Sequence, residues 1–301
     1  MRSRTALSLI ALSIMLSVPA LGQTPLNAEI KERIQYIPPG VEHRTGDFRL
    51  TSKLMGREMP YKLILPEDYS RENGAKFPVV FLLHGLTGRY NNWIEKTKLK
   101  QYSDLHNFII VTPEGDNGWY TDSFSTPNDK YESYIVKELI PEIDKKFRTV
   151  ANRENRFIAG LSMGGYGSLK FGLKYPDMFS LVGSFSGALG AASLSATNAG
   201  AFIGGGIDKI YGPPDSETRK ANDIFTLIRE VTPEKLKAMP FIYQSCGTED
   251  FLIQNNRDFL ALMNEKKVPH EYREFPGGHD WKFWDDQVRE FLDVAARRMK
   301  K

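Results

Sequence analysis

The chain has 301 residues, of which 41% are hydrophobic and 26% charged, with a formal net charge of +3 at pH 7. This length suits one large domain or two small ones, and the nearly balanced charge gives no indication of nucleic acid or an anionic membrane as a partner. The single cysteine, Cys246, excludes an internal disulfide, and its apolar surroundings predict a small core residue.

Residues 1–22 have the pattern of a signal peptide. Arg2 and Arg4 give a positive start, residues 5–18 form an uncharged apolar run, and small residues precede a cleavage point after Gly22. A membrane anchor is the alternative, but the run is shorter than the ~20 apolar residues that span a bilayer. We therefore predict export to the periplasm or the medium, with no stable membrane insertion after cleavage. Removing this segment removes two arginines, so the net charge falls from +3 to +1.

Residues 23–46 are predicted to be an N-terminal arm, and residues 47–301 the catalytic domain. The stretch "DFRLTSKLMGREMPYKLILP" predicts two strands that turn at Gly56. Continuous apolar runs follow in "FPVVFLLHG", "FIIVTPEG", "RFIAG" and "MPFIYQSCG", and such runs are typical of parallel strands buried on both faces.

Three helical patterns, at residues 131–147, 163–176 and 281–301, lie between or after these runs. Strands that alternate with helices predict an α/β fold, with a mostly parallel central sheet and helices on both faces. Residues 186–217 depart from this pattern because they are rich in Gly, Ala, Ser and Pro. A surface loop is the plain alternative. We interpret the segment as an insertion near the active site that acts as a lid or substrate loop.

The motif Gly160-Leu161-Ser162-Met163-Gly164 fits the G-x-S-x-G pattern of a nucleophile elbow. A chance match to the pattern is common. However, a short apolar strand precedes Ser162 and a helical pattern follows it, as the elbow requires. The related stretch "GSFSG" at residues 183–187 has the wrong spacing, and we interpret it as the end of a strand.

A serine nucleophile needs a base, and the base needs an orienting acid. Of the five histidines, His279 is favoured because "GGHDW" presents it on a glycine turn before a helix, whereas His84 is expected to brace its own turn. In "CGTEDFL", Asp250 follows a buried strand, with Glu249 as the alternative acid. The order Ser162, Asp250, His279 is that of α/β-hydrolases.

The glycines of "HGLTG" allow backbone N–H groups to face a pocket, and we assign the amides of Leu86 and Met163 to an oxyanion hole. The sequence contains no paired histidines at helical spacing, no cysteine cluster and no phosphate loop, so no metal and no cofactor is expected.

These segments together, with "GWYTDS", "YESYIVKELIPEID" and "FIAGLSMGGYGSLKFGLKYPDMFS", resemble the esterase D-like family of α/β-hydrolases. That family includes tributyrin, feruloyl and acetylxylan esterases, S-formylglutathione hydrolases and mycolyltransferases. The resemblance runs from about Phe77 to the C-terminal helix and is interrupted in the insertion. It implies the same triad and oxyanion donors. It also places Trp119 and Tyr120 near the acyl pocket, with core packing as the alternative, and Glu132 in the interior of the site.

The predicted function is an exported serine carboxylesterase that forms an acyl-enzyme and acts on short acyl esters or ester-decorated carbohydrates, in the manner of feruloyl esterases. The alternatives within the family are a thioesterase like S-formylglutathione hydrolase and an acyltransferase. A binding protein that reuses the hydrolase fold would lack a triad member, and a serine peptidase would carry an extra propeller or a larger cap.

Overall fold

The computed structural model describes residues 40–70, 74–195 and 200–299, and only the backbone of residues 200–205. The predicted signal peptide lies outside the described residues, as does the predicted arm up to residue 39. Residues 41–46 already belong to the sheet, because β1 begins at Val41 and β2 at Thr45. The boundary predicted at residue 47 is therefore too late.

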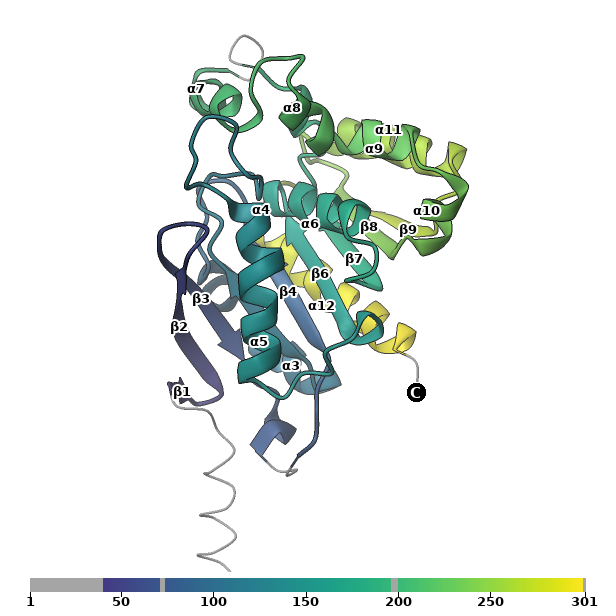
Figure 1. Cartoon of the computed structure of the whole chain (residues 1–301). Coiled ribbons are helices and arrows are strands. Elements are labelled where there is room, and N and C mark those ends of the chain that lie inside the picture. Colours follow the sequence, from purple (N-terminus) through teal and green to yellow (C-terminus); the bar gives the residue numbers. More distant parts are fainter. Residues whose placement is uncertain (1–39, 71–73, 196–199, 300–301) are drawn as a thin grey trace, which may run out of the picture.

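The described residues form a nine-stranded sheet in the order β1-β2-β3-β5-β4-β6-β7-β8-β9. The strands are β1 (Val41–Glu42), β2 (Thr45–Ser52), β3 (Arg57–Ile64), β4 (Val79–Leu83), β5 (Ile109–Pro113), β6 (Arg156–Leu161), β7 (Leu181–Phe185), β8 (Phe241–Gly247) and β9 (His270–Phe275). From β5 to β9 all neighbours pair in parallel, whereas β1, β2 and β3 pair antiparallel and β3 joins β5 antiparallel (Figure 1).

The α/β prediction is confirmed, and the four apolar runs form β4, β5, β6 and β8. The predicted hairpin is β2–β3, in which Ser52 pairs with Arg57 and the turn contains Gly56 at a φ of +63°. The strand β7 ends at Phe185, so "GSFSG" does contain a strand end as predicted.

Helices follow most strands. They are α2 (Asn92–Lys96), α3 (Leu99–His106), α4 (Tyr131–Tyr134), α5 (Ile140–Lys146), α6 (Met163–Lys174), α7 (Gly200–Tyr211), α8 (Glu217–Asn222), α9 (Ile224–Arg229), α10 (Pro233–Ala238), α11 (Ile253–Glu265) and α12 (Trp281–Arg298). The predicted helix at 131–147 is one helical stretch whose middle, Ile135–Leu139, is a π-helical turn between α4 and α5.

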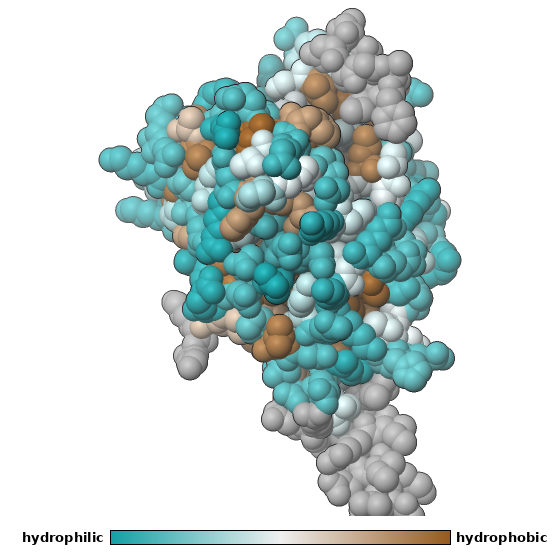
Figure 2. All heavy atoms as spheres, turned by 180° about the vertical axis from the view of Figure 1, so that it is seen from behind, coloured by the Kyte–Doolittle hydropathy of each residue, from teal (hydrophilic) through white to brown (hydrophobic). Residues whose placement is uncertain are grey.

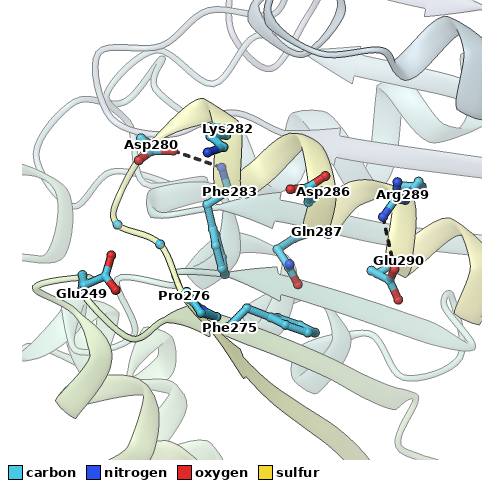
Figure 3. Close-up of a pocket in the computed structure, with 12 residues that line it drawn as sticks. Glu249, Phe275, Pro276, Asp280, Lys282, Phe283, Asp286, Gln287, Arg289 and Glu290 are labelled. Carbon is cyan, nitrogen blue, oxygen red and sulfur yellow. Dashed lines mark hydrogen bonds and ion pairs between the residues drawn. The ribbon is translucent and has the colours of Figure 1, made fainter.

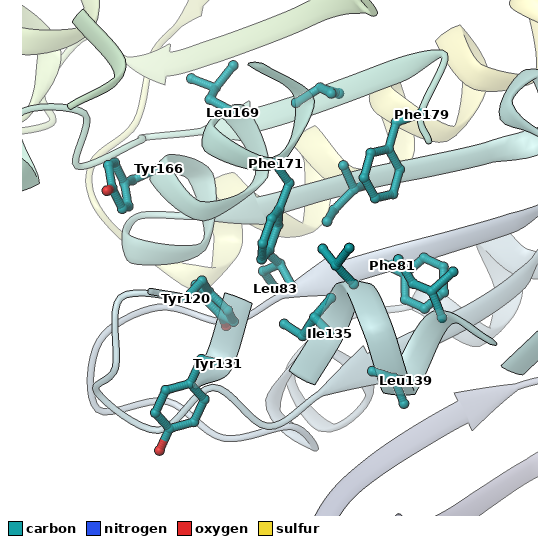
Figure 4. Close-up of a cluster of buried hydrophobic side chains, with 14 of the residues drawn as sticks. Phe81, Leu83, Tyr120, Tyr131, Ile135, Leu139, Tyr166, Leu169, Phe171 and Phe179 are labelled. Atoms are coloured by element: carbon teal, nitrogen blue, oxygen red, sulfur yellow. The ribbon is translucent and has the colours of Figure 1, made fainter. Parts of the chain in front are cut away.

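Both faces of the sheet are buried, which explains why its central strands lack polar alternation. In β4, Phe81 and Leu83 join the cluster that packs against α4, α5 and α6 (Figure 4). Val80 and Leu82 point to the opposite cluster, which contains side chains of α3 and α12. The central strands are therefore packed on both faces, and the loops at the carboxyl edge of the sheet are the segments available to carry a site.

The face of the molecule that is hidden in Figure 1 is mainly hydrophilic, and its hydrophobic areas are small and separate (Figure 2). Within the residues that the structure describes, no helix has the length and apolarity needed to cross a bilayer.

The predicted insertion at 186–217 is not one irregular loop. It contains a 3₁₀ turn at Ala191–Ser193 and the helix α7, while residues 196–199 lie outside the described residues. It packs on the segment 123–125, where the Phe124 N–H donates to the Ile210 carbonyl at 2.8 Å. In the part of the insertion that the structure describes, no residue lines the cavity beside Ser162.

Candidate active site

Three of the predicted site residues lie at one edge of the sheet. Ser162 directly follows β6, Asp250 lies in the turn after β8, and His279 lies in the loop between β9 and α12. Because β6, β7, β8 and β9 are parallel neighbours, their carboxyl ends meet at the same edge. The topology thus brings together residues that are far apart in the chain.

The three side chains form one hydrogen-bonded chain. His279 Nε2 lies 3.0 Å from Ser162 Oγ, and His279 Nδ1 lies 2.9 Å from Asp250 Oδ2. The Leu252 N–H donates to the other oxygen of Asp250 at 2.8 Å. Asp250 is buried, whereas Glu249, the alternative acid, is exposed and takes no part in these hydrogen bonds. The arrangement matches the geometry by which a base activates a serine.

The Asp250 carboxylate is held in its ionised form. Burial works to raise the pKa of Asp250, but the hydrogen bonds from His279 and from the Leu252 N–H outweigh burial and leave this pKa below its ordinary value. An ionised acid fixes the imidazole with Nδ1 protonated, so that Nε2 faces the serine as an acceptor.

Two aromatic rings flank the imidazole of His279. The Phe251 ring centroid lies 4.6 Å from that of His279, and Trp284 meets it edge-on at 4.9 Å. Phe251 is 77% exposed although it contacts a site residue. The sequence interpretation missed both rings, although Phe251 directly follows Asp250.

Ser162 occupies a strained backbone conformation at the elbow, with φ +53° and ψ −115°. Its N–H donates to the Phe185 carbonyl at 2.9 Å, which ties the elbow to the neighbouring strand. The flanking glycines are required by space: a Cβ on Gly160 would lie 2.4 Å from the Gly164 backbone, and one on Gly164 would lie 2.3 Å from the Leu83 carbonyl oxygen.

We expect Gly164→Ala to lower the free energy of unfolding by about 2–4 kcal/mol, because backbone rather than a movable side chain blocks the new methyl group. Urea unfolding followed by circular dichroism measures the loss. Gly206→Ala in α7 is the matched control, since a Cβ there meets nothing within 4 Å. Equal stability of the two variants would contradict this account of the elbow.

The two predicted oxyanion donors lie on either side of the elbow: Leu86 lines a cavity beside Ser162, and Met163 is the buried residue that follows Ser162. Met163 is the first residue of α6, where an N–H has no partner within the helix. Among the described residues, no acceptor receives the N–H of Leu86 or of Met163. The cavity has a volume of about 360 Å³ and is lined by Gly85, Leu86, Thr87, Gly88, Asn92, Lys96, Leu161, Ser162, His279, Asp280, Trp281 and Trp284.

A larger cavity, of about 430 Å³, lies beside the same loop but contains none of the three triad residues (Figure 3). Its walls come from the end of β9, the glycines before His279 and the first turns of α12, with charged side chains of both signs around it. Asp280 lines both cavities and caps α12, because its Oδ1 accepts the Phe283 N–H at 3.0 Å. Ser162 and His279 line the smaller cavity.

Trp119 and Tyr120 do not line either of these cavities. Both are buried, and both have a φ of +52°. Trp119 packs edge-on against Tyr166, and the Tyr120 hydroxyl donates to the His84 carbonyl at 2.9 Å. Both side chains therefore take part in core packing, which is the alternative stated for this pair.

A buried charge network holds the Trp119–Tyr120 segment. Lys170 of α6 donates to the Tyr120 carbonyl at 2.6 Å and pairs with Glu132 at 3.0 Å, while Lys174 pairs with Glu132 at 2.6 Å. Burial works to raise the pKa of Glu132, but the two lysines outweigh it and lower this pKa to about 2. Burial also lowers the pKa of Lys170 to about 8. Glu132 thus neutralises two lysines, one of which holds the Tyr120 backbone.

The remaining histidines do not join the triad. His84 bonds to Gly85 and Glu114, as expected for a residue that braces its turn, while His106 lies 2.6 Å from Asp293. Cys246 is buried, and burial raises the pKa of its thiol to about 12. Within the described ranges, no group of three or more His, Cys, Asp or Glu side chains is placed to hold a metal ion.

With this geometry in view, the comparisons with known proteins are informative. A family model described as "Putative esterase" matches residues 52–292. The chain belongs to this esterase family. It is 30% identical over 256 residues to an acetyl esterase of Caldicellulosiruptor saccharolyticus, which covers 82% of this chain and 96% of that protein. It is 26% identical over 252 residues to the S-formylglutathione hydrolase of Mus musculus, covering 75% and 83% of the two chains.

Solved structures agree with this assignment to the esterase family. The fluorophosphonate-binding serine hydrolase F of Staphylococcus aureus superposes with a TM-score of 0.75 at 27% identity, over 84% of this chain and 98% of that one. A ferulic acid esterase superposes with a TM-score of 0.72 at 28% identity, over 85% and 98%. The fold is that of the α/β-hydrolases, and the protein is an esterase.

Proposed function

We propose that the protein is an exported serine carboxylesterase that cleaves short acyl esters or ester-decorated carbohydrates through an acyl-enzyme. The observation that carries the proposal is the series of hydrogen bonds Ser162–His279–Asp250, of which Ser162 and His279 line the 360 Å³ cavity. The predicted signal peptide at residues 1–22 is the basis for export.

The reaction would begin when His279 Nε2 takes the Ser162 proton as Oγ attacks the ester carbonyl. The amides of Leu86 and Met163 would stabilise the negative oxygen of the tetrahedral intermediate, and His279 would then protonate the departing alcohol. Water, activated by the same imidazole, would cleave the acyl-enzyme and release the acid. Asp250 would stabilise the imidazolium in both halves of the reaction.

The substrate class rests on the relatives and on the size of the cavity. One relative is named an acetyl esterase and one structural neighbour a ferulic acid esterase. A cavity of about 360 Å³, walled by Trp281, Trp284 and Leu161, has room for a short or planar acyl group. The relative named S-formylglutathione hydrolase makes a thioesterase the second candidate. The predicted export argues against this candidate, because such thioesters are found in the cytosol.

Labelling with a fluorophosphonate tests the nucleophile. We expect one equivalent of the probe to attach to the peptide that contains Ser162, because Oγ lies 3.0 Å from its base, and we expect Ser162→Ala to remain unlabelled. Mass spectrometry of the digested protein locates the adduct. A heat-unfolded sample is the control. Attachment to any other serine would refute the assignment.

A substrate panel separates the candidates. Initial rates are compared for acetyl, butyryl, octanoyl and feruloyl esters and for S-formylglutathione. The proposal expects the highest kcat/KM on an acetyl, butyryl or feruloyl ester. A preference for S-formylglutathione would establish the thioesterase instead.

A further inference from the structure

A buried ion pair lies directly behind the oxyanion turn. His84 is the residue after β4 and Glu114 the residue after β5, and both side chains are at least 95% buried. His84 Nε2 lies 2.9 Å from Glu114 Oε1, and His84 Nδ1 lies 2.8 Å from the Gly85 carbonyl oxygen. The proposed mechanism makes no use of either side chain.

The contacts of Glu114 favour an ionised carboxylate. Its Oε1 accepts the N–H of Asp116 at 2.8 Å and that of Gly115 at 3.0 Å. Burial works to raise the pKa of Glu114, but the hydrogen bond and charge of His84, together with these backbone donors, leave this pKa below its ordinary value. An ionised carboxylate only accepts hydrogen bonds, so the proton between Glu114 and His84 belongs to Nε2.

The second ring nitrogen of His84 also faces an acceptor. A neutral imidazole carries one N–H, and a bare nitrogen 2.8 Å from a carbonyl oxygen would place two lone pairs against each other. Both contacts are satisfied together when both nitrogens are protonated. The Gly115 N–H lies within hydrogen-bond distance of both His84 Nε2, at 2.9 Å, and Glu114 Oε1, at 3.0 Å, so the carboxylate can accept it when Nε2 is itself a donor.

The Gly85 carbonyl and the Leu86 N–H belong to the same peptide unit. The carbonyl oxygen receives His84 Nδ1–H and also the Gly88 N–H at 3.0 Å. In a trans peptide the N–H points opposite to the carbonyl, so fixing the oxygen from behind turns the Leu86 N–H toward the cavity. A hydrogen bond from a cation on the oxygen also polarises the peptide and strengthens its N–H as a donor.

We propose that His84 and Glu114 are a positioning pair: Glu114 keeps His84 as an imidazolium, which orients and polarises the Leu86 N–H for the oxyanion. The inference rests on the proposed function, because it assumes that Leu86 serves the oxyanion. Tyr120 completes the support by donating to the His84 carbonyl. Arg89, which is 62% exposed at 4.0 Å from Glu114, is paired with Asp116.

The protonation state is tested on the wild-type protein without turnover. With ¹⁵N-labelled histidine, NMR at pH 7.5 is expected to show His84 with both ring nitrogens protonated, whereas in Glu114→Gln it should carry one proton. Glutamine keeps the volume of glutamate and an acceptor oxygen for the two backbone N–H groups. A neutral His84 in the wild-type protein would overturn the inference.

Kinetic measurements then distinguish a pair that polarises the Leu86 N–H from a pair that only packs behind the turn. For Glu114→Gln we expect kcat to fall about tenfold with KM and the thermal midpoint nearly unchanged, because the donor is weakened but stays in place. Glu95→Gln on α2, which removes an exposed carboxylate, is the matched control and should behave as wild type. A loss confined to KM or to thermal stability would overturn the inference.

Ser162→Ala, assayed in parallel, distinguishes a failure of the proposed function from a failure of the inference about His84 and Glu114. If Ser162→Ala still hydrolyses esters at the wild-type rate, the proposed function has failed and so has the role of Leu86. If hydrolysis depends on Ser162 but His84 is neutral, only the inference about the pair has failed.

Discussion

Replacing Ser162 by alanine is expected to lower kcat for ester hydrolysis by about 10⁴- to 10⁶-fold, because the acyl-enzyme cannot form without its oxygen. The loss should appear in kcat, since the walls of the cavity remain intact. Stopped assays with a chromogenic acetyl ester at high enzyme concentration measure the residual rate.

The control for this substitution is Ser180→Ala. Ser180 precedes β7 at the amino-terminal edge of the sheet, where its hydroxyl donates to the Glu154 carbonyl, and it has no role in the proposed chemistry. We expect wild-type rates from that variant. A Ser162→Ala protein that retains more than a hundredth of the wild-type kcat would show that the triad is not the reacting group.

Replacing Glu132 by glutamine is expected to reduce the free energy of unfolding by about 3–5 kcal/mol. The change keeps the shape of the side chain but leaves the fully buried Lys170 without its counter-charge. Lys174 is partly exposed and can turn to water, so the cost falls mainly on Lys170. Urea unfolding at pH 7 measures the difference.

The same carboxyl predicts how stability changes in acid. The pKa of Glu132 is lowered from 4.5 to about 2 on folding, so between these values the unfolded chain binds more protons than the folded one. The free energy of unfolding therefore falls as the pH drops from 5 to 2, by up to about 3 kcal/mol from this group. The slope should be shallower in Glu132→Gln, which lacks the carboxyl.

A double variant is the control for the buried pair. Glu132→Gln combined with Lys170→Met removes both charges and should be more stable than Glu132→Gln alone, because no buried charge is left unpaired. If the double variant is the less stable of the two, the network does not hold this region by its charges.

The elements that the sequence predicts well are those whose pattern is local. The apolar runs predict β4, β5, β6 and β8 because strands buried on both faces must be apolar at every position. The order of Ser162, Asp250 and His279 predicts the site because each residue follows a strand or precedes a helix that can be recognised separately.

The strand β9 was missed because it lies at the edge of the sheet. Its sequence, "HEYREF", is partly exposed at every position and has no apolar run, so His270 is easily interpreted as a solvent residue. His270 instead begins the strand that leads to His279. The edge position is a property of the whole sheet and leaves no local signal.

The role of Glu114 depends on a long-range pairing. Glu114 meets His84 because β4 and β5 run in parallel, with Val79 opposite Ile109. The sequence shows a carboxylate after an apolar run but does not show which residue it faces. Trp119 and Tyr120 illustrate the same limit, since only the structure shows that both are buried and that the Tyr120 hydroxyl donates to the His84 carbonyl.

The placement of the proposed triad after three different strands has a consequence for how activity would arise. Ser162 and His279 are 117 residues apart, and they meet only when β6, β7, β8 and β9 are assembled in register. A segment that ends before β9 can contain the whole elbow and still lack a base. Under the proposed mechanism, hydrolytic turnover is therefore a property of the assembled sheet, and it reports on folding of the carboxyl half of the chain.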